Sequence, residues 1–247
     1  MEGRISKYVE LSKQDPEKSK DWAPMHKDDM TRLYRVSEKN GKDVTEIIIA
    51  VAEIERVTAG EMVAVFHSQD LKMKWDQSIE MSSLLENKDE FCSVYHQVQK
   101  RIWPSAQRDF VYESHKQKLG EGENPDWVVC NVSCEHSEAP DSKYCRATIE
   151  VVFYCQTIVS GDPSKRENVK CKIFYSAKID PGGWVPAAAI KAAANSEYPK
   201  FIKNIGKFAQ NHVKDAGIVF WFLGEIEIWL IIFYVCVCVS RVRNLFW

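Results

Sequence analysis

The chain has 247 residues, of which 45% are hydrophobic and 28% charged, and its formal net charge is −2. This composition is ordinary for a soluble globular chain, and the length allows a sizeable core and an enclosed cavity. A nearly neutral chain lacks the basic surface that nucleic-acid binding requires, so we expect no nucleic-acid partner.

The cysteines predict neither a metal site nor a disulfide framework. No two of the eight form a Cys-x-x-Cys pair. Most lie among apolar or β-branched residues, where a free cysteine behaves as a small hydrophobic side chain. Residues 1–20 also lack the apolar core of a signal peptide. We therefore expect reduced thiols in a cytoplasmic protein, with no metal and no cofactor.

The first quarter of the chain favours a helix and then a β-hairpin. Residues 4–13 favour a short helix. Residues 31–36 and 44–54 favour strands, and the turn between them contains Asn40-Gly41. This dipeptide is a strong hairpin signal because both residues tolerate a positive φ.

Helices are expected after the hairpin. Thr58 is a good N-cap for a helix that continues to about Ser68, because its hydroxyl can accept a hydrogen bond from an unpaired backbone N–H. Residues 69–86 have a mixed pattern, from which we expect one or two short helices around Trp75.

Residues 91–178 are predicted to form successive strands joined by short turns, which favours an antiparallel sheet. The clearest strand covers residues 144–157. Its odd positions are apolar and its even positions begin as polar, so one face is expected to meet a core and the other water. The odd positions are Ala147, Ile149, Val151, Phe153 and Cys155.

A long helix is predicted to end the domain. Helical spacing of apolar residues begins after Pro186 and continues to about Asp215. Pro199 lies inside this pattern and predicts a kink rather than an end, because the periodicity resumes after it. Together the elements predict an α+β fold in which a curved antiparallel sheet covers this helix.

Four stretches of sequence carry a family resemblance. They are VYHQVQKRIWPSAQRDFVY (94–112), WVVCNVSCEHSEAP (127–140), CKIFYSAKIDPGGWVP (171–186) and EYPKF (197–201). In this order they resemble START lipid-transfer domains, and more narrowly the ceramide-binding branch of that family. The resemblance covers residues 22–219, leaving residues 1–21 as a lead-in and residues 220–247 as an atypical apolar tail.

The resemblance implies a helix-grip fold with an internal lipid tunnel, and transfer of one ceramide-like lipid between membranes without bond chemistry. It also implies a monomer that acts in the cytoplasm and touches endoplasmic-reticulum and Golgi membranes transiently. Matched motif to motif, it assigns ligand binding to Asp76, Gln97, Asn131 and Tyr175. Ceramide has an amide and two hydroxyls but no charge, which suits a few neutral or mixed donors and acceptors in an apolar wall.

Taken alone, the residues leave several alternatives open. Strand alternation places Tyr175 on an apolar face, where its hydroxyl could instead bind a backbone carbonyl. The pattern around Asn131 does not decide which face is the inner one, and that around Gln97 is typical of a solvated face. Asp76 is shorter than the glutamate of the ceramide branch, so it reaches a ligand through water or forms an exposed i,i+4 ion pair with Lys72. Arg108 is expected to pair with the adjacent Asp109.

Two loops are candidates for membrane contact. Trp103-Pro104 lies in one loop, and Trp184-Val185 follows two glycines in another. Indole rings favour the boundary between water and lipid, so the resemblance and the chemistry both favour docking on a bilayer. The alternative is that both tryptophans pack locally as parts of a lid.

Other functions compete with ceramide transfer. The same fold can carry diacylglycerol, a sterol or phosphatidylcholine, or serve as a lipid sensor. A hydrolase is disfavoured, because Cys134 and His136 are near each other in sequence but have no third group to orient them. We therefore expect no enzymatic activity.

The apolar tail at 220–247 admits three interpretations: a membrane anchor, an interfacial or partner-bound segment, or an aberrant end without evolved structure.

Overall fold

A computed structural model describes residues 2–14, 16, 18–40, 43–122, 124–140 and 143–214. The tail at 220–247 lies outside the described residues. The helices are α1 (Glu2–Ser12), α2 (Ala59–His67), α3 (Gln69–Trp75) and α4 (Ala187–Val213), with a short 3-10 helix at Arg166–Asn168. The strands are β1 (Trp22–Lys27), β2 (Thr31–Asn40), β3 (Asp43–Glu55), β4 (Ile79–Asn87), β5 (Cys92–Gln99), β6 (Arg108–Leu119), β7 (Asp126–Ser133), β8 (Cys145–Arg146), β9 (Thr148–Val159) and β10 (Val169–Asp180).

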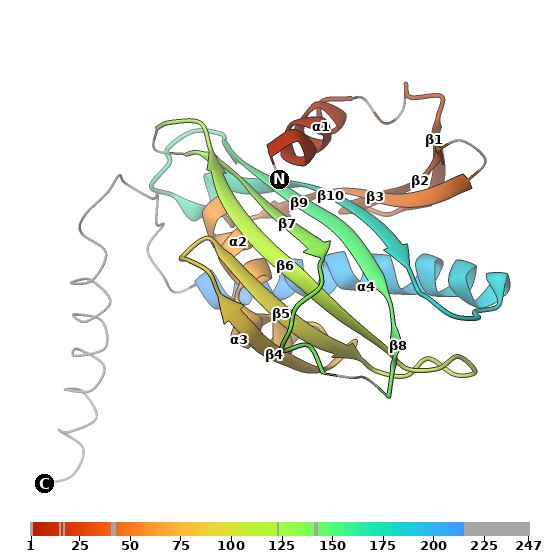
Figure 1. Ribbon diagram of the computed structural model, residues 1–247. Coiled ribbons are helices and arrows are strands. Elements are labelled where there is room, and N and C mark those ends of the chain that lie inside the picture. Colours follow the sequence, from red (N-terminus) through yellow and green to blue (C-terminus); the bar gives the residue numbers. More distant parts are fainter. Residues whose placement is uncertain are drawn as a thin grey trace, which may run out of the picture.

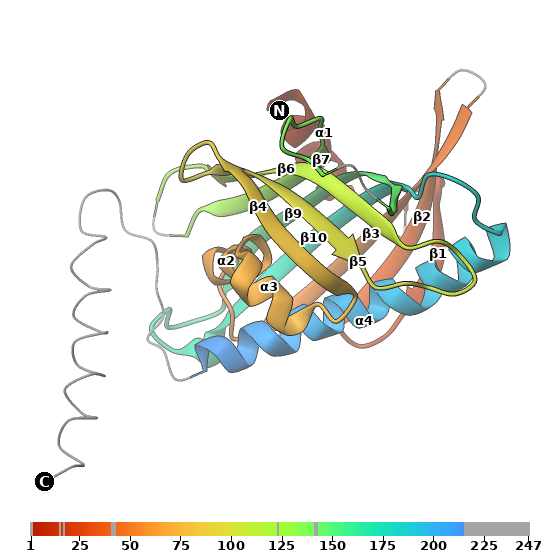
Figure 2. The same cartoon turned by 60° about the horizontal axis from the view of Figure 1, so that its bottom comes forward.

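The strands form one sheet in the order β1-β2-β3-β10-β9-β7-β6-β5-β4. Neighbours along this path are antiparallel, and only the short β8 pairs in parallel, with β6. The sheet curves so that α2, α3 and α4 lie on its concave side and α1 lies on its convex side (Figures 1 and 2). The predicted α+β fold, a curved antiparallel sheet around a long C-terminal helix, is confirmed.

Alternate residues of the same strands enter two different cores. On the concave side, Val151, Phe153 and Cys155 pack with residues of α2 and α4. On the convex side, Val152 and Tyr154 pack beneath Ile5 and Tyr8 of α1. The water-exposed face predicted for this strand is therefore wrong in its second half, because an amphipathic helix from the N-terminus covers it.

The helix after the hairpin begins as predicted. The Thr58 hydroxyl accepts from the Glu61 backbone N–H at 3.2 Å, and the Glu61 carboxylate accepts from the Thr58 N–H at 2.8 Å. This capping box satisfies two donors that a helix start leaves unpaired.

Two strands differ from the sequence prediction. Residues 79–87 form strand β4 and not a helix, and strand β1 was not predicted at all. Both are edge strands with mixed burial, so neither shows the clean alternation that identifies a strand in sequence.

Helix α4 continues through Pro199, so the prediction that the proline does not end the helix is confirmed. The helix reaches the sheet closely at Gly206, where a Cβ atom would lie 2.7 Å from Ile54 Cδ1. Ile202 and Ile205 on the same stretch are fully buried. Among the described helices, none is both long and apolar enough to cross a bilayer.

Candidate functional site

The concave face carries buried polar groups that have no partner in the described chain. Asn131, on β7, has the same orientation as Val129 of the inner core, and its side chain is 4% exposed. Its Oδ1 atom is buried and accepts no hydrogen bond.

Tyr175, on β10, is 6% exposed, and its hydroxyl makes no hydrogen bond with any described residue. Burial raises the pKa of Tyr175 well above its usual value. The alternative in which Tyr175 binds a backbone carbonyl is therefore wrong.

Gln97 lies in a chain of side-chain hydrogen bonds. Its Oε1 accepts from the Tyr112 hydroxyl at 3.0 Å, and that hydroxyl accepts from Gln69 Nε2 at 3.4 Å. Ser82 donates to Gln69 Oε1 at 2.8 Å, which ties β4 to α3. Gln97 is 6% exposed, so the interpretation as a solvated face is wrong. Its amide N–H groups make no hydrogen bond with the described residues and remain available as donors.

Lys72 places a cation inside the same region. The residue is 6% exposed, and its Nζ lies 5.1 Å from the Phe66 ring centroid and 5.8 Å from that of Tyr112. Burial lowers the pKa of Lys72, and it forms no ion pair with a described residue. The exposed Lys72–Asp76 ion pair is therefore wrong, because α3 turns Lys72 towards the core.

Asp76 caps the C-terminus of α3 at the edge of this region. Its Oδ1 accepts from the Ser78 N–H at 3.1 Å and from the Ser78 hydroxyl at 2.5 Å. Burial is the main cause that raises the pKa of Tyr112 and of Tyr175. The negative charge of the Asp76 carboxylate raises both pKa values further. The carboxylate thus lies within electrostatic range of both hydroxyls.

Three of the four residues assigned from sequence lie on the concave face of the sheet, on three different strands, and Asp76 lies apart from them at the end of α3. Asn131 is opposite Val151 on β9, and Tyr175 is opposite Phe153 on the same strand. These two apolar side chains therefore separate the unpaired groups of β7 and β10. Gln97 is opposite Phe110, on the far side of β6 from Asn131.

Aromatic rings pack the centre of the space between sheet and helices. Phe66 stacks on Phe153 with a centroid distance of 4.2 Å, and Phe201 of α4 lies 5.1 Å from Tyr175 and 5.2 Å from Trp75. Two cavities of about 370 and 260 Å³ lie elsewhere, one beside the end of α1 and one beside the β1–β2 turn.

Sequence reasoning missed a second polar pair on the same face. His67, at the end of α2, has its Nδ1 atom 3.1 Å from the Ser114 hydroxyl. Burial lowers the pKa of His67 to about 4, so the ring is neutral at neutral pH. Ser114 is opposite Asn131 in the β6–β7 ladder. Strand alternation through Arg108–Leu119 places Tyr112 and Ser114 on the same face. This alternation would have identified both residues as members of the polar set on that face.

Cys134 and His136 are not arranged for nucleophilic catalysis. Burial raises the pKa of the Cys134 thiol, which disfavours the reactive thiolate. His136 Nε2 lies 3.2 Å from a Glu86 carboxylate oxygen, and its Nδ1 accepts from the Glu138 N–H at 3.2 Å. Both ring nitrogens are thus engaged away from the thiol.

The two tryptophan loops lie side by side at one end of the sheet (Figures 1 and 2). Trp103 is 82% exposed and Trp184 is 76% exposed. Next to them Pro104 is exposed and Val185 half-buried. The alternative in which both tryptophans pack locally is wrong, because neither ring is covered.

Comparison with known proteins connects this geometry to one family. A family model described as "START domain" matches residues 6–215. The human ceramide transfer protein is 32% identical over 228 residues, which cover 89% of this chain and 36% of that protein. The mouse phosphatidylcholine transfer protein is 26% identical over 65% of this chain and 72% of its own length. The crystal structure of human STARD10 superposes with a TM-score of 0.69 at 18% identity, covering 85% of this chain and 79% of that one. The chain spans about a third of the length of the ceramide transfer relatives that it matches.

Proposed function

Because the chain belongs to the START family, we propose that it binds one ceramide-like lipid on the concave face and carries it between membranes without changing a bond. The observation that carries this proposal is the set of buried polar groups without partners in an apolar core. Asn131 and Tyr175 are the clearest members. An unpaired buried polar group costs about 1–3 kcal/mol, so such a set is favoured where a ligand completes it.

The unpaired atoms match the polar end of ceramide in kind. Asn131 Oδ1 needs a donor, which the amide N–H or a hydroxyl of ceramide provides. The N–H groups of Gln97 can donate to the ceramide carbonyl. Phosphatidylcholine has no N–H or O–H donor, so it would leave Asn131 unpaired. Asp76 is expected to act at the edge of the site, where its carboxylate reaches the ligand through a water molecule.

Membrane exchange is assigned to the exposed tryptophan loops. Trp103 and Trp184 project from one end of the sheet with Pro104 and Val185 beside them. Large apolar side chains at such exposure mark a contact site, and indole rings suit a lipid interface. The expectation of a cytoplasmic monomer that touches endoplasmic-reticulum and Golgi membranes is kept as part of this proposal.

The binding site is tested by extraction of lipid from liposomes. Asn131→Ala is expected to reduce ceramide extraction about tenfold, and Tyr175→Phe to reduce it less, because each loses a buried hydrogen bond to the ligand. Gln156→Ala, on the convex face, is the control and should extract normally. Unchanged extraction by both inner-face variants would remove the site assignment. Native mass spectrometry of the purified chain identifies the bound lipid directly.

Lys72 favours a second candidate, a lipid that carries a phosphate. Burial lowers the pKa of Lys72 and the Asp76 charge offsets this only in part, so an anionic oxygen, which ceramide lacks, would favour the charged form of this side chain. Under this alternative Lys72→Met abolishes extraction of phosphatidylcholine or another phospholipid. Under the first proposal it leaves ceramide extraction within about threefold of the unchanged chain.

The docking role is tested by separating kinetics from equilibrium. Trp184→Ala is expected to slow lipid exchange between vesicles at least about fivefold while changing the equilibrium amount of bound lipid little, because the ring acts only at the membrane. If exchange kept its rate, the docking role would be wrong.

A further inference from the structure

The guanidinium of Arg108, at the start of β6, holds both tryptophan loops at once. Its Nε donates to the carbonyl oxygen of Pro181 at 3.2 Å, and its Nη2 donates to those of Gly182 at 3.3 Å and Trp184 at 3.4 Å. Its Nη1 donates to the carbonyl of Ala106, in the loop that carries Trp103. One side chain therefore connects two segments more than seventy residues apart in sequence.

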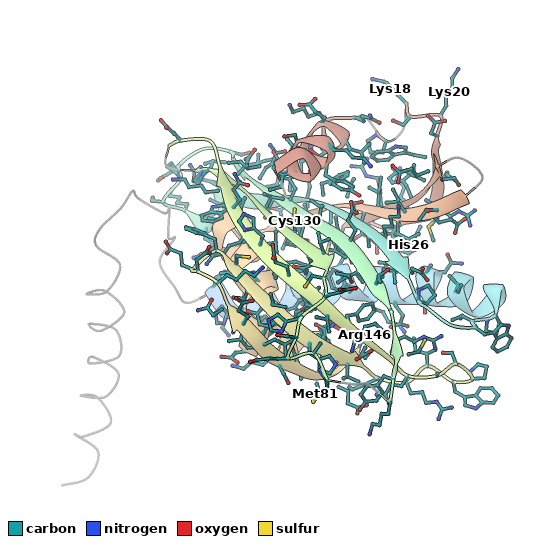
Figure 3. The ribbon with its side chains drawn as sticks, viewed as in Figure 1. Lys18, Lys20, His26, Met81, Cys130 and Arg146 are labelled. Carbon is teal, nitrogen blue, oxygen red and sulfur yellow. The ribbon has the colours of Figure 1, made fainter. Side chains whose placement is uncertain are left out.

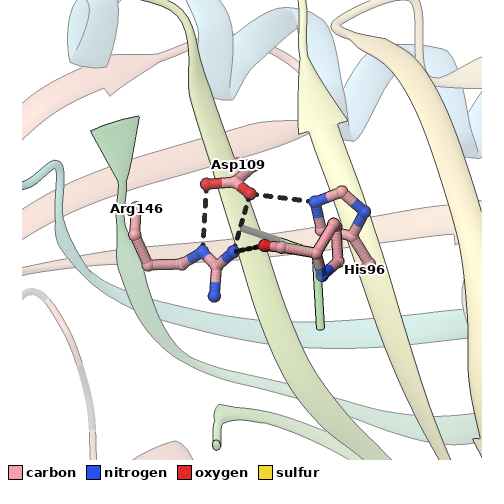
Figure 4. Close-up of polar contacts among 4 residues, drawn as sticks. His96, Asp109 and Arg146 are labelled. Atoms are coloured by element: carbon pink, nitrogen blue, oxygen red, sulfur yellow. Dashed lines mark hydrogen bonds and ion pairs between the residues drawn. The ribbon is translucent and has the colours of Figure 1, made fainter. Parts of the chain in front are cut away.

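The neighbouring carboxylate does not compete for Arg108. Asp109 faces the convex side, where it accepts from Arg146 Nε and Nη2 at 3.0 Å each and lies 2.9 Å from His96 Nε2. Figure 4 shows this cluster, and Figure 3 labels Arg146 on the whole chain. The predicted Arg108–Asp109 pair is thus wrong, because adjacent strand residues point to opposite faces. Arg108 forms no ion pair with a described residue, so its donors serve the loop carbonyls.

The Trp184 loop is built to present its backbone to Arg108. Gly182 and Gly183 have φ angles of +58° and +56°, which side-chain-bearing residues rarely adopt. A Cβ atom at Gly182 would lie 2.5 Å from the Arg146 carbonyl oxygen, and one at Gly183 would lie 2.9 Å from Cys145 Sγ. The loop therefore lies flat against β8, and its carbonyls turn towards β6.

We propose that Arg108 is a positioning residue that makes the two tryptophan loops one unit. The Trp184 loop then moves away from the Trp103 loop only after these hydrogen bonds break. The functional consequence rests on the proposed membrane contact: with Arg108 in place, both rings meet a bilayer together. Separate loops would each have to find the bilayer by themselves, which weakens the combined contact.

Hydrogen–deuterium exchange on the protein alone tests the link. The Ser105 N–H donates to the Ile102 carbonyl in one loop, and the Gly182 N–H donates to the Asp180 carboxylate in the other. Arg108→Gln is expected to speed exchange at both amides at least about tenfold, since several charge-assisted bonds are lost. Arg101→Gln is the matched control. Among the described residues, Arg101 donates only within its own loop, to the Ser105 carbonyl, so this variant should affect Ser105 and not Gly182.

Arg108→Lys is a second, more conservative variant, which keeps the test possible if Arg108→Gln does not fold. It keeps the charge but presents one ammonium in place of a planar fork, and it is expected to speed exchange at Gly182 by a smaller factor. A Gly182 exchange rate within twofold of the unchanged chain in both variants would overturn the proposal. So would an equal increase at Gly182 in Arg101→Gln.

Vesicle partitioning then measures the consequence for docking. In the unchanged chain, Trp103→Ala and Trp184→Ala are expected to be coupled, so their combined effect on partitioning differs from the product of the single effects. In the Arg108→Gln background the effects should become independent. Coupling that persists there would contradict a joining role for Arg108. If neither tryptophan affects partitioning in any background, the docking proposal fails while the exchange result on Arg108 stands by itself.

Discussion

On the convex face of the sheet, most buried polar groups are paired with one another, whereas on the concave face paired groups lie beside two, Asn131 and Tyr175, whose side chains have no complete set of partners among the described residues. The Tyr8 hydroxyl donates to Glu150 at 2.9 Å and that of Tyr154 to Asp126 at 2.5 Å, both on the convex side. On the concave side Asn131 Oδ1 and the Tyr175 hydroxyl are unpaired. Ser176 is the convex exception, with a hydroxyl buried beside Tyr8.

The difference between paired and unpaired buried groups distinguishes residues that stabilise the fold from residues that bind a ligand. Paired buried groups contribute to stability, and unpaired ones cost free energy that folding must offset elsewhere. Strand β7 carries both kinds, with Asp126 paired and Asn131 unpaired. We therefore expect substitutions of paired groups to change the free energy of unfolding, and substitutions of the unpaired concave-face groups to change the lipid bound.

The largest expected effect on stability is at Asp109. Asp109→Asn removes the charge that Arg146 and His96 share, and should lower the free energy of unfolding by about 3 kcal/mol in a urea titration. Asp70→Asn, at an exposed carboxylate, is the control and should change it by about 0.5 kcal/mol or less. The comparison predicts unchanged lipid preference in Asp109→Asn. A stable variant with altered preference would contradict it.

The next largest expected effect is a pH dependence of the free energy of unfolding, which His67 causes. Burial lowers its pKa to about 4 from the ordinary 6.5. Between these pH values the unfolded chain binds a proton that the folded chain does not. Stability should therefore fall as the pH falls through this window, by about 2 kcal/mol in total after allowing for partial exposure.

His67→Gln tests this assignment. Urea titrations at several pH values should show a weaker dependence in this variant between pH 6.5 and 4. The control, His212→Gln at an exposed position, should keep the full dependence. An unchanged slope in His67→Gln would assign the effect to other groups.

A matched pair of tyrosines compares the two faces directly. Tyr154→Phe loses a charge-assisted bond to Asp126 and should cost about 1.5 kcal/mol of stability. Tyr175→Phe loses a hydroxyl without a protein partner, so its unfolding free energy should stay within about 0.5 kcal/mol. Thermal and urea unfolding measure both, and equal losses would remove the distinction between the faces.

The smallest expected effect is at Lys72. Lys72→Met removes a buried charge and keeps an apolar chain of similar length, at the loss of its contacts with the Phe66 and Tyr112 rings. We expect a gain of about 1 kcal/mol in the free energy of unfolding. A loss of similar size would show that the ammonium is well accommodated in the folded protein.

Local patterns predicted much of the fold. The β2–β3 hairpin, the Thr58 cap and the helix through Pro199 each follow from spacing and from the chemistry of one or two residues. The edge strands β1 and β4 were missed, because a strand with mixed burial has no clean period for sequence to show. The inward orientation of Tyr175 followed from alternation, whereas that of Asn131 did not, since both faces of its strand are apolar.

The sequence by itself determined most of the element types, the antiparallel order of the later strands and the resemblance to START domains, because these depend on neighbours along the chain. Only the tertiary structure decided that α1 covers part of the convex face, that Lys72 points inwards and that Asp109 binds Arg146 and His96. It also decided that Arg108 reaches the loop of Trp184. Such contacts join residues far apart in sequence, and a strand or helix pattern specifies a face without specifying what will cover it.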